Sequence, residues 1–435
     1  MGSEMLLQYM WEYRLWDDSR CLTTDGRPVR VIDPGLRNTA DGPDFFNAKI
    51  YIGDRLWAGN VEIHTRATDW HRHGHDGDRA YDTVILHVVA DSDCHVSRPD
   101  GSAIPQLIMP YVPDFRERYL AMVNNTAHTP ACAREIEALP SIHVTEWLTA
   151  LGFDRLYAKV ERIDRWLEAN DGDWQATAYV ALARALGFGT NSDAFERLAR
   201  SMPLRILLKH RDDIHMLEAA LYGRAGLLDI DLDDVTDPDD AYYLERLRAD
   251  YRFICAKYSL APVEALQFRT TRPANAPHRR IAALIALLSD GFSFGRRFSH
   301  IDSERSARAI FDLRLPAYWI DHYGFGRRSA SVNRALSADS VTSLLINAVI
   351  PLMYAYGVNY GNERTLDAAV DMLQTLPPET NFITRIFKGV GIKCPDAFTS
   401  QAMVELHNSY CSQRKCIYCR LGRRFLTAKA MGLES

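Results

Sequence analysis

Carboxylate and imidazole side chains gather in one stretch near the N-terminal end of the chain. Six of the 14 histidines fall within 32 residues, and Asp44 and Glu62 are the carboxylates that stand out beside them. Ionised carboxylates and neutral imidazoles are common protein ligands of divalent cations. This stretch is therefore the first candidate for metal-dependent chemistry. Its histidines are His64, His71, His73, His75, His87 and His95.

The spacing of Glu62 and His64 predicts that these two side chains act together. Alternate residues of a strand share a face, so in the strand-like run 56–65 both project to one side. A charged carboxylate beside an imidazole in an apolar strand costs desolvation energy unless the two are paired or bound to a metal. Asp44 stands at the start of the neighbouring run and can reach the same point.

The ligand types indicate which cation such a site would hold. Oxygen ligands from Asp44 and Glu62 suit Mg²⁺ or Mn²⁺, whereas imidazoles from His71, His73 and His75 shift the preference towards Zn²⁺, manganese or iron. If a helical turn begins near residue 69, His71 and His75 share one face and His73 lies on another. The alternative is a structural polar network in which carboxylates and backbone groups satisfy the histidines.

The same segment resembles the PD-(D/E)XK nuclease pattern, through Pro43-Asp44 before a hairpin and Glu62-Ile63-His64 on the following strand. The resemblance implies that Asp44 and Glu62 bind magnesium and that His64 orients or deprotonates the attacking water. It also implies a helix before the sheet, in which Glu12 is the counterpart of the family's helical Glu. The chain departs from the pattern in two ways. His64 replaces the usual Lys, and the segment between residues 62 and 83 is too rich in His and Gly for a confident crossover helix.

A second group of metal-ligand residues lies near the C-terminal end. Cys411, Cys416 and Cys419 fall within nine residues of a chain that has eight cysteines in all. Four thiolates would complete a zinc or [4Fe–4S] site, and Cys394 is the nearest fourth thiol along the sequence. His407 offers a Cys₃His alternative that favours zinc. The competing interpretation is a set of free, buried cysteines.

The cysteines stand among basic and aromatic residues. Cations neutralise phosphates and aromatic rings stack on bases, so this segment is a candidate contact for DNA or RNA. A basic segment is also a common form of solvated surface. The candidate nucleic-acid-binding residues are Arg414, Lys415, Arg420, Arg423 and Arg424.

The elements that must position these residues follow from periodicity. The spacing predicts a helix over 6–16, then strands over 29–32, 48–52, 56–65 and 83–90, with weaker strands near 94–97 and 104–108. Gly53-Asp54 predicts a hairpin turn. From about residue 141 the apolar residues recur every three or four positions, which predicts helices to about 390.

The predicted fold class is α+β, and three domains are expected. Residues 1–115 form a mixed, mostly antiparallel sheet with a flanking helix, residues 116–390 are all-α, and residues 391–435 are a small cysteine-rich module that binds a metal. The stretch 229–240 contains seven Asp, but a calcium-loop glycine and a closing Glu are missing, so a solvated acidic loop is expected.

Composition excludes several classes of protein. The chain has 435 residues, of which 47% are hydrophobic and 25% charged, which rules out intrinsic disorder. The most apolar run, 341–356, is too short to span a membrane and contains Asn347 and Pro351, so no membrane association is expected. No secretory signal is evident, so we expect a cytoplasmic protein with reduced thiols. The net charge of −5 excludes a uniformly cationic nucleic-acid coat but not a local basic patch.

Nearly the whole chain resembles an uncharacterised bacterial family known as domain of unknown function 2851. The resemblance implies a bacterial cytoplasmic protein and carries no established activity. The leading functional hypothesis is a metal-dependent phosphodiesterase, similar to a nuclease, that acts on nucleic acid. The alternative is a non-catalytic nucleic-acid-binding or scaffold protein with a structural zinc or iron–sulfur site. The resemblance rests on Gly42–Phe45, Trp57–His64, Asp69–His75, Tyr81–Val89 and the three C-terminal cysteines.

Overall fold

The computed structural model divides by packing into two compact units. The first comprises Met1–Trp147, Gly389–Gly391 and Leu406–Ser435, and the second comprises Leu148–Lys388 and Ile392–Glu405. The C-terminal cysteine segment therefore packs with the N-terminal sheet, and the predicted division into three domains stays a prediction. The structure describes residues 2–98, 100–110, 115–124, 130–136, 139–261, 266–269, 276–291, 293–294, 301, 303–330 and 335–427.

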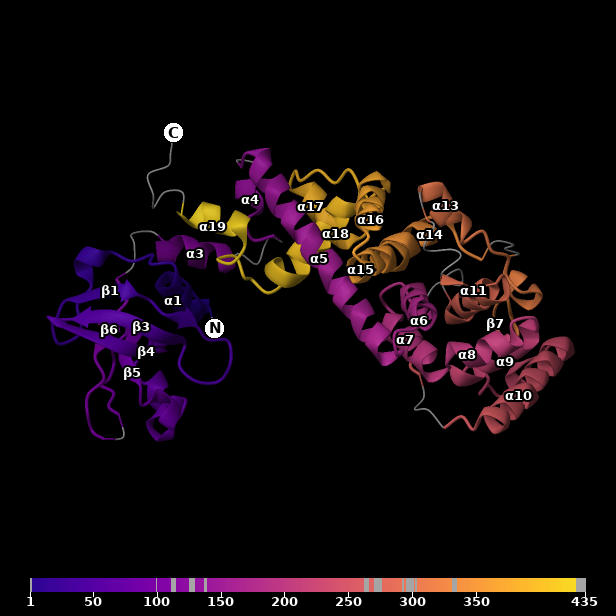
Figure 1. Ribbon diagram of the computed structural model, residues 1–435, viewed down its shortest axis with the longest axis horizontal. Helices are drawn as coiled ribbons and strands as arrows, with labels where there is room; N and C mark the ends of the chain where they lie inside the picture. The colour runs from indigo at the N-terminus through magenta and orange to yellow at the C-terminus, as the bar shows by residue number, and fades with distance from the viewer. Residues whose placement is uncertain are drawn as a thin grey trace. The chain divides into compact units, whose positions relative to one another are not determined.

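The first unit is built on a mixed sheet, as the sequence predicts, with the helix α1 (Gly2–Glu12) packed against it (Figure 1). The strand order is β1-β3-β4-β5-β6, with β2 paired to β3. The pairs formed by β1, β2, β3 and β4 are antiparallel, whereas β4–β5 and β5–β6 are parallel. The strands are β1 (Val29–Asp33), β2 (Leu36–Arg37), β3 (Phe45–Ile52), β4 (Arg55–Arg66), β5 (Val84–Asp91) and β6 (Gln106–Ile108).

Local sequence explains the centre of this sheet. Gly53 takes a φ of +60° in the turn between β3 and β4, so the predicted hairpin is confirmed. The run Val84–Val89 of β5 is buried on both faces, as expected for a strand with parallel neighbours. On α1, Leu6, Leu7, Met10 and Trp11 are buried, so one apolar stripe fixes the helix on the sheet. The weak strand predicted near 94–97 is only an isolated bridge between Ser97 and Ala103.

The connection from β4 to β5 contains no long crossover helix. It consists of α2 (Asp69–Arg72) and the 3₁₀ turns His75–Gly77 and Arg79–Tyr81. Gly74 adopts a left-handed conformation with φ +77°, which ends the helical geometry after His73. The chain direction therefore changes between His73 and His75.

Several helices complete the first unit. They are α3 (Phe115–Val123), α4 (Ala133–Ile136), the beginning of α5 (Ser141–Ala169), the π-helical turn His407–Cys411 and α19 (Arg420–Thr427). The helices α3 and α19 lie side by side (Figure 1), although they are almost 300 residues apart in the sequence. This packing brings the C-terminal cysteines to the segment that follows the sheet.

The second unit is helical around one large apolar core. The prediction of an all-α region misses the short hairpin of β7 (His322–Gly324) and β8 (Arg327–Arg328). Two- and three-residue strands carry no periodic signal, so the pattern could not reveal them. Besides α5, the helices are α6 (Trp174–Leu186), α7 (Ser192–Ser201), α8 (Leu204–Leu207), α9 (Ile214–Arg224), α10 (Pro238–Tyr258), α11 (Pro277–Ser289), α13 (Glu304–Ala309), α14 (Ala338–Leu344), α15 (Ile350–Tyr360), α16 (Glu363–Thr375), α17 (Phe382–Gly389) and α18 (Ala397–Leu406).

The apolar run around residue 350 is a longer helix than the sequence predicts. Helix α14, the π-helical turn Leu345–Val349 and α15 form a continuous segment that passes through Asn347 and Pro351. Proline cannot donate an intrahelical hydrogen bond, and the wide π turn lies directly before it. The Ile346 carbonyl accepts a hydrogen bond from Lys159 Nζ at 3.1 Å. The interruption is thus accommodated rather than ending the helix.

This segment, Ala338–Tyr360, is long and apolar enough to cross a membrane by length and composition, and it alone meets that test in the described part of the chain. However, 72% of its most apolar window is buried inside the second unit. A core helix has the same composition, so burial among other helices accounts for its apolar character.

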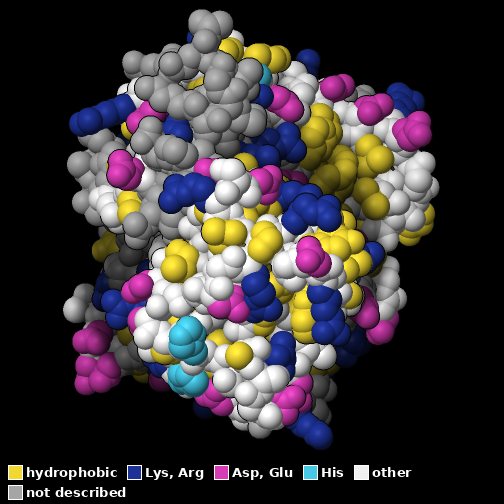
Figure 2. Space-filling view, turned by 90° about the vertical axis from the view of Figure 1, so that its left-hand side faces the viewer, with side chains coloured by type: hydrophobic (Ala, Val, Ile, Leu, Met, Phe, Trp, Pro, Cys, Tyr) yellow, Lys and Arg dark blue, Asp and Glu magenta, His cyan; other side chains and the backbone are white. Residues whose placement is uncertain are grey.

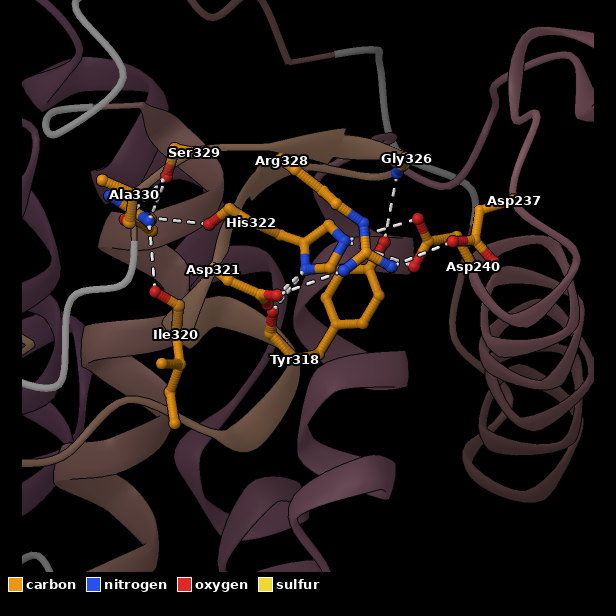
Figure 3. Close-up of polar contacts among 11 residues, drawn as sticks. Asp237, Asp240, Tyr318, Ile320, Asp321, His322, Gly326, Arg328, Ser329 and Ala330 are labelled. Carbon is orange, nitrogen blue, oxygen red and sulfur yellow. Dashed lines mark hydrogen bonds and ion pairs between the residues drawn. The ribbon is translucent and has the colours of Figure 1, made fainter.

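The Asp-rich stretch 229–240 is largely exposed, as predicted, and its last residues also cap and anchor a helix. Asp237 caps α10, and the buried Asp240 lies 3.3 Å from His322 Nε2 (Figure 3). His322 Nδ1 lies 2.8 Å from Asp321 Oδ1, and Arg328 bridges Asp237 and Asp321. These polar groups satisfy one another, so the network holds the β7–β8 hairpin to the start of α10.

Candidate metal centre

Two carboxylates meet where β3 begins beside β4. The backbone N–H of Asp44 donates to Glu62 Oε2 at 3.1 Å, and Asp44 Oδ2 accepts from the Ile63 N–H at 3.0 Å. Asp44 Oδ1 accepts from Gln8 Nε2 of α1 at 2.8 Å. The β3–β4 register shifts between Phe45 and Ala48, and a bulge of this kind re-aims the neighbouring backbone. These contacts fix both carboxyl groups in one orientation.

Three histidines converge on the same place. The ligand nitrogens of His64, His73 and His75 all lie within 4.8 Å of one another. His64 Nε2 is 3.1 Å from His73 Nδ1 and 3.4 Å from Glu62 Oε1. His75 Nε2 is 3.3 Å from the same Glu62 oxygen. Because His73 is exposed whereas His64 and His75 are buried, the cluster opens to solvent on the His73 side.

Surrounding side chains hold these rings in place. His64 Nδ1 lies 2.9 Å from Nε2 of the fully buried His87, which stands opposite Glu62 in the parallel β4–β5 register. If His64 donates through Nδ1, its Nε2 keeps the lone pair that faces the cluster, as is usual for a metal-bound imidazole. The Tyr81 ring stacks on His75 at 3.8 Å, and Trp70 packs edge-on against both His75 and His87.

Burial controls the protonation of these groups. It raises the pKa of Asp44 to about 7, with the nearby Glu62 charge adding to the shift, and raises the pKa of Glu62 to about 8. Burial lowers the pKa of His64 to about 2 and of His87 to about 3, and neighbouring histidines add to both shifts. At pH 7 the two imidazoles are therefore neutral, whereas the carboxyl pair retains protons that a cation would displace.

The donor set fits a divalent cation. Bonds of about 2.0–2.1 Å to a tetrahedral ion place its ligand atoms about 3.3–3.4 Å apart, which matches the Glu62–His64 and Glu62–His75 separations. Among the described side chains, His75 Nε2 and His87 Nδ1 are buried without a hydrogen-bond partner, so the 3.3 Å approach of His75 to Glu62 lacks hydrogen-bond geometry. An unpartnered buried nitrogen costs about 1–3 kcal/mol, and a cation in the cluster would remove that cost at His75.

The structure brings together most, but not all, of the residues that the sequence suggests. Asp44, Glu62, His64, His73 and His75 converge. His71 does not: its ring is about half exposed and its Nδ1 lies 2.7 Å from Asp76. The helical spacing that grouped His71 with His75 ends at Gly74, which is why His73 takes that place.

The helix residue expected to join the site is also a different one. Glu12 pairs with Arg37 at 3.4 Å, whereas Gln8 contacts Asp44, and Glu4 raises the pKa of both Asp44 and Glu62. The signal was present in the sequence, because Glu4 and Gln8 are four residues apart and so share a helix face. His87, embedded in an apolar run, gave no such signal.

The C-terminal candidates are distributed over both units. Cys416 and Cys419 are buried and Cys411 is partly buried in the first unit, whereas Cys394 lies in the second unit beside Lys388 and Asp396. His407 Nδ1 contacts the adjacent Asn408 side chain at 3.1 Å. The cations of this segment differ in surroundings: Arg420, Arg423 and Arg424 are exposed, and Arg414 and Lys415 are partly buried.

Metal binding at the carboxylate–histidine cluster is expected to strengthen as pH rises. Protons on Asp44 and Glu62, whose pKa values are about 7 and 8, compete with the cation, so affinity should increase from about pH 6 and level off above about pH 8. Titration calorimetry with Mn²⁺ in two buffers of different ionisation enthalpy should detect proton release near pH 6.5 and almost none near pH 9. An affinity that is the same at both pH values would contradict this assignment of the carboxyl protons.

Comparison with known proteins yields one match. A family model described as "Protein of unknown function (DUF2851)" matches residues 4–382, which include every residue of the carboxylate–histidine cluster and end before the C-terminal cysteines. No protein with a curated description and no solved structure matches the chain significantly.

Proposed function

Because the chain belongs to the DUF2851 family of proteins of unknown function, we propose its activity from the site itself: metal-dependent hydrolysis of phosphodiester bonds in DNA or RNA. The observation that carries the proposal is the convergence of Asp44 and Glu62 with His64, His73 and His75 in a partly open, otherwise buried cluster. Perturbed carboxyl groups and unpartnered imidazoles at one point are typical of catalytic metal sites.

The ligand set favours Zn²⁺ or Mn²⁺ over Mg²⁺, because three imidazole nitrogens join the carboxylate oxygens. Glu62, His64, His73 and His75 would hold the ion, and a cation that accepts more than four ligands would keep a position open for water. A bound cation polarises a phosphoryl oxygen and lowers the pKa of a bound water. His64 serves better as a ligand than as a base, because its pKa is about 2 and both of its nitrogens already face other groups.

Asp44 is the best candidate for the proton acceptor. Burial raises the pKa of Asp44 to about 7 in the metal-free site. A bound cation would favour the ionised carboxylate, which is the form that accepts a proton. Hydrogen bonds from Gln8 and Ile63 orient its carboxyl group beside Glu62. Asp44 can therefore accept a proton from water while Glu62 remains with the metal.

Exposed arginines on the first unit support the proposal of a nucleic-acid substrate. Arg423 lies 4.8 Å from the Tyr13 ring, just beyond the end of α1, the helix that supplies Gln8 to the site. Arg420 and Arg424 are exposed on the same helix, α19. On the face seen in Figure 2, Lys and Arg side chains form several separate groups among acidic and uncharged side chains. A local contact of this kind is compatible with a net charge of −5.

A cleavage assay on the full chain tests this proposal. Single- and double-stranded DNA and RNA are incubated with the protein and Mn²⁺, Zn²⁺ or Mg²⁺, and product formation is compared for wild type, Asp44→Asn and His71→Ala. We expect cleavage with Mn²⁺ or Zn²⁺, a loss of at least about a hundredfold in Asp44→Asn, and wild-type rates in His71→Ala. The His71 variant is the matched control, since it removes an imidazole from the same segment but outside the cluster.

Absence of cleavage of every substrate with every metal would refute the proposal, as would equal rates in wild type and Asp44→Asn. Binding of nucleic acid without cleavage would instead support a non-catalytic binding or scaffold protein.

A further inference from the structure

A fourth cysteine lies with the three cysteines of the C-terminal segment. Cys132 immediately precedes α4, in the segment between the sheet and α5, and only 8% of it is exposed. Cys411 ends the π-helical turn, and Cys416 and Cys419 lie in the turn before α19. All four residues belong to the first unit, although Cys132 and the other three are almost 300 residues apart in the sequence.

Each of these thiols is within electrostatic range of the other three. Cys132 interacts with Cys411, Cys416 and Cys419, Cys411 interacts with Cys416 and Cys419, and Cys416 interacts with Cys419. Burial and these mutual interactions raise the pKa of Cys416 to about 11, and they raise those of Cys132 and Cys411 further. Four cysteines that lie near one another in the first unit, three of them buried and Cys411 partly buried, are a complete set of thiolate ligands for one metal centre.

The spacing of the sulfurs distinguishes between two kinds of metal centre. A Cys₄ zinc site, with bonds of about 2.3 Å, would place its sulfurs about 3.8 Å apart. Among the described residues, the histidine cluster has three potential metal-ligand atoms within 4.8 Å of one another, and these cysteines do not. No three of these sulfurs therefore lie that close together. Wider spacing suits a [4Fe–4S] cluster, in which each thiolate binds a different iron.

The surroundings of the thiols are also those of an anionic centre. Burial raises the pKa of the Cys419 thiol, and the nearby backbone N–H groups of Gly422 and Leu421 and the Trp147 indole lower it. Trp147 is only 6% exposed, and its Nε1 has no hydrogen-bond partner among the described residues. Nη1 of Arg414 is likewise buried without a partner, and its charge acts on Cys411 and Cys416.

Unpartnered buried donors are costly unless an anion accepts them. In iron–sulfur proteins, donors to the sulfurs stabilise the negatively charged cluster and tune its potential. Four neutral thiols alone would leave Trp147 and Arg414 without this compensation.

We infer that Cys132, Cys411, Cys416 and Cys419 together ligate a [4Fe–4S] cluster, with Cys132 as the fourth ligand. Each thiol loses its proton and forms one Fe–S bond. The cluster fastens the C-terminal segment to the segment between the sheet and α5, and it does so whether or not the carboxylate–histidine cluster is catalytic. Since closure of a loop of this length restricts the unfolded chain strongly, the cluster should also stabilise the first unit.

Metal and sulfide analysis of the full chain tests this inference. The protein is expressed in iron-replete cells, purified without oxygen and supplied with iron and sulfide. We expect about four irons and four acid-labile sulfides per chain, with broad absorption in the visible range. Cys132→Ala should bind clearly less iron and sulfide per chain than wild type, and its visible absorption should fall in proportion. Cys21→Ala, a buried cysteine of the same unit, and Cys394→Ala, the nearest cysteine in sequence, should both match wild type.

A second measurement needs no variant, in case Cys132→Ala fails to fold. Alkylation followed by peptide mass spectrometry should show that all four cysteines of wild type are protected together and react together after chelation of iron. Absence of iron and sulfide from the reconstituted protein, or one bound zinc ion per chain with no sulfide, would overturn the assignment of the cluster. A Cys132→Ala protein with the wild-type iron content, or reaction of Cys132 before chelation, would overturn its role as a ligand.

Discussion

Replacing Glu62 by Gln is expected to lower metal-dependent cleavage by at least about a thousandfold, equivalent to about 4 kcal/mol of transition-state stabilisation. Glu62 Oε1 is the atom that lies 3.4 Å from His64 and 3.3 Å from His75, so the substitution removes the anionic oxygen shared by two imidazoles. The amide keeps the shape of the side chain and still offers an oxygen to the Asp44 N–H. The loss should therefore be one of metal affinity and rate, not of folding.

The same substitution is expected to stabilise the metal-free protein at high pH, although it lowers the cleavage rate. Burial raises the pKa of Glu62 from 4.5 to about 8, so the metal-free native state binds this proton more tightly than the unfolded state. The associated stability is complete below about pH 4.5 and is lost as pH rises through about 8. Gln removes this pH-dependent loss. We expect metal-free Glu62→Gln to melt at the same temperature as wild type near pH 5 and at a higher temperature near pH 8.5.

Thermal melts in the presence of a chelator, together with cleavage rates at saturating Mn²⁺, measure both effects. His71→Ala is the control, because it should change neither quantity appreciably. A Glu62→Gln protein that melts much lower than wild type at pH 8.5 would mean that the carboxylate, not its protonated form, stabilises the fold. A rate within tenfold of wild type would remove Glu62 from the catalytic site.

Gly422→Ala is expected to destabilise the first unit and to lower its iron–sulfur content. A Cβ at this position would overlap the Cys416 carbonyl oxygen and would lie 3.2 Å from the Cys416 Cα, so the turn that carries two of the proposed ligands would have to move. Forced displacement in a packed region typically costs about 1–3 kcal/mol. The Leu421 and Gly422 N–H groups that act on Cys419 would move with it.

Gly389→Ala provides the matched control in the same unit, since a Cβ there meets nothing within 4 Å and Ala favours a helical position. Chemical denaturation and iron analysis should show a loss for Gly422→Ala and none for Gly389→Ala. If Gly422→Ala retained full stability and a full cluster, the close approach of α19 to Cys416 would not matter to the site.

The sequence predicted the sheet well because its strands have strong local signals. The hairpin at Gly53, the buried run of β5 and the apolar stripe of α1 each follow from residues that are close in sequence. For the same reason, the shared face of Glu62 and His64 could be predicted from period-two alternation alone.

The rest of the site depends on contacts that sequence spacing does not encode. Gly74 adopts a left-handed conformation between His73 and His75, and the four-residue spacing of a continuous helix does not apply across it. Gln8 reaches Asp44 across 36 residues, and Cys132 reaches the C-terminal cysteines across almost 300. Cys394, the nearest fourth cysteine in sequence, belongs to the other packing unit. Proximity along the chain was therefore a poor guide to the fourth ligand.

X-ray diffraction from crystals soaked in Mn²⁺, recorded at the manganese absorption edge, tests the central claim most directly. We expect one anomalous peak within bonding distance of Glu62, His64, His73 and His75, and its loss in crystals of Glu62→Gln. Absence of a peak there in wild-type crystals, or an equal peak in both proteins, would contradict a metal centre built on Glu62 and leave the cluster a structural polar network.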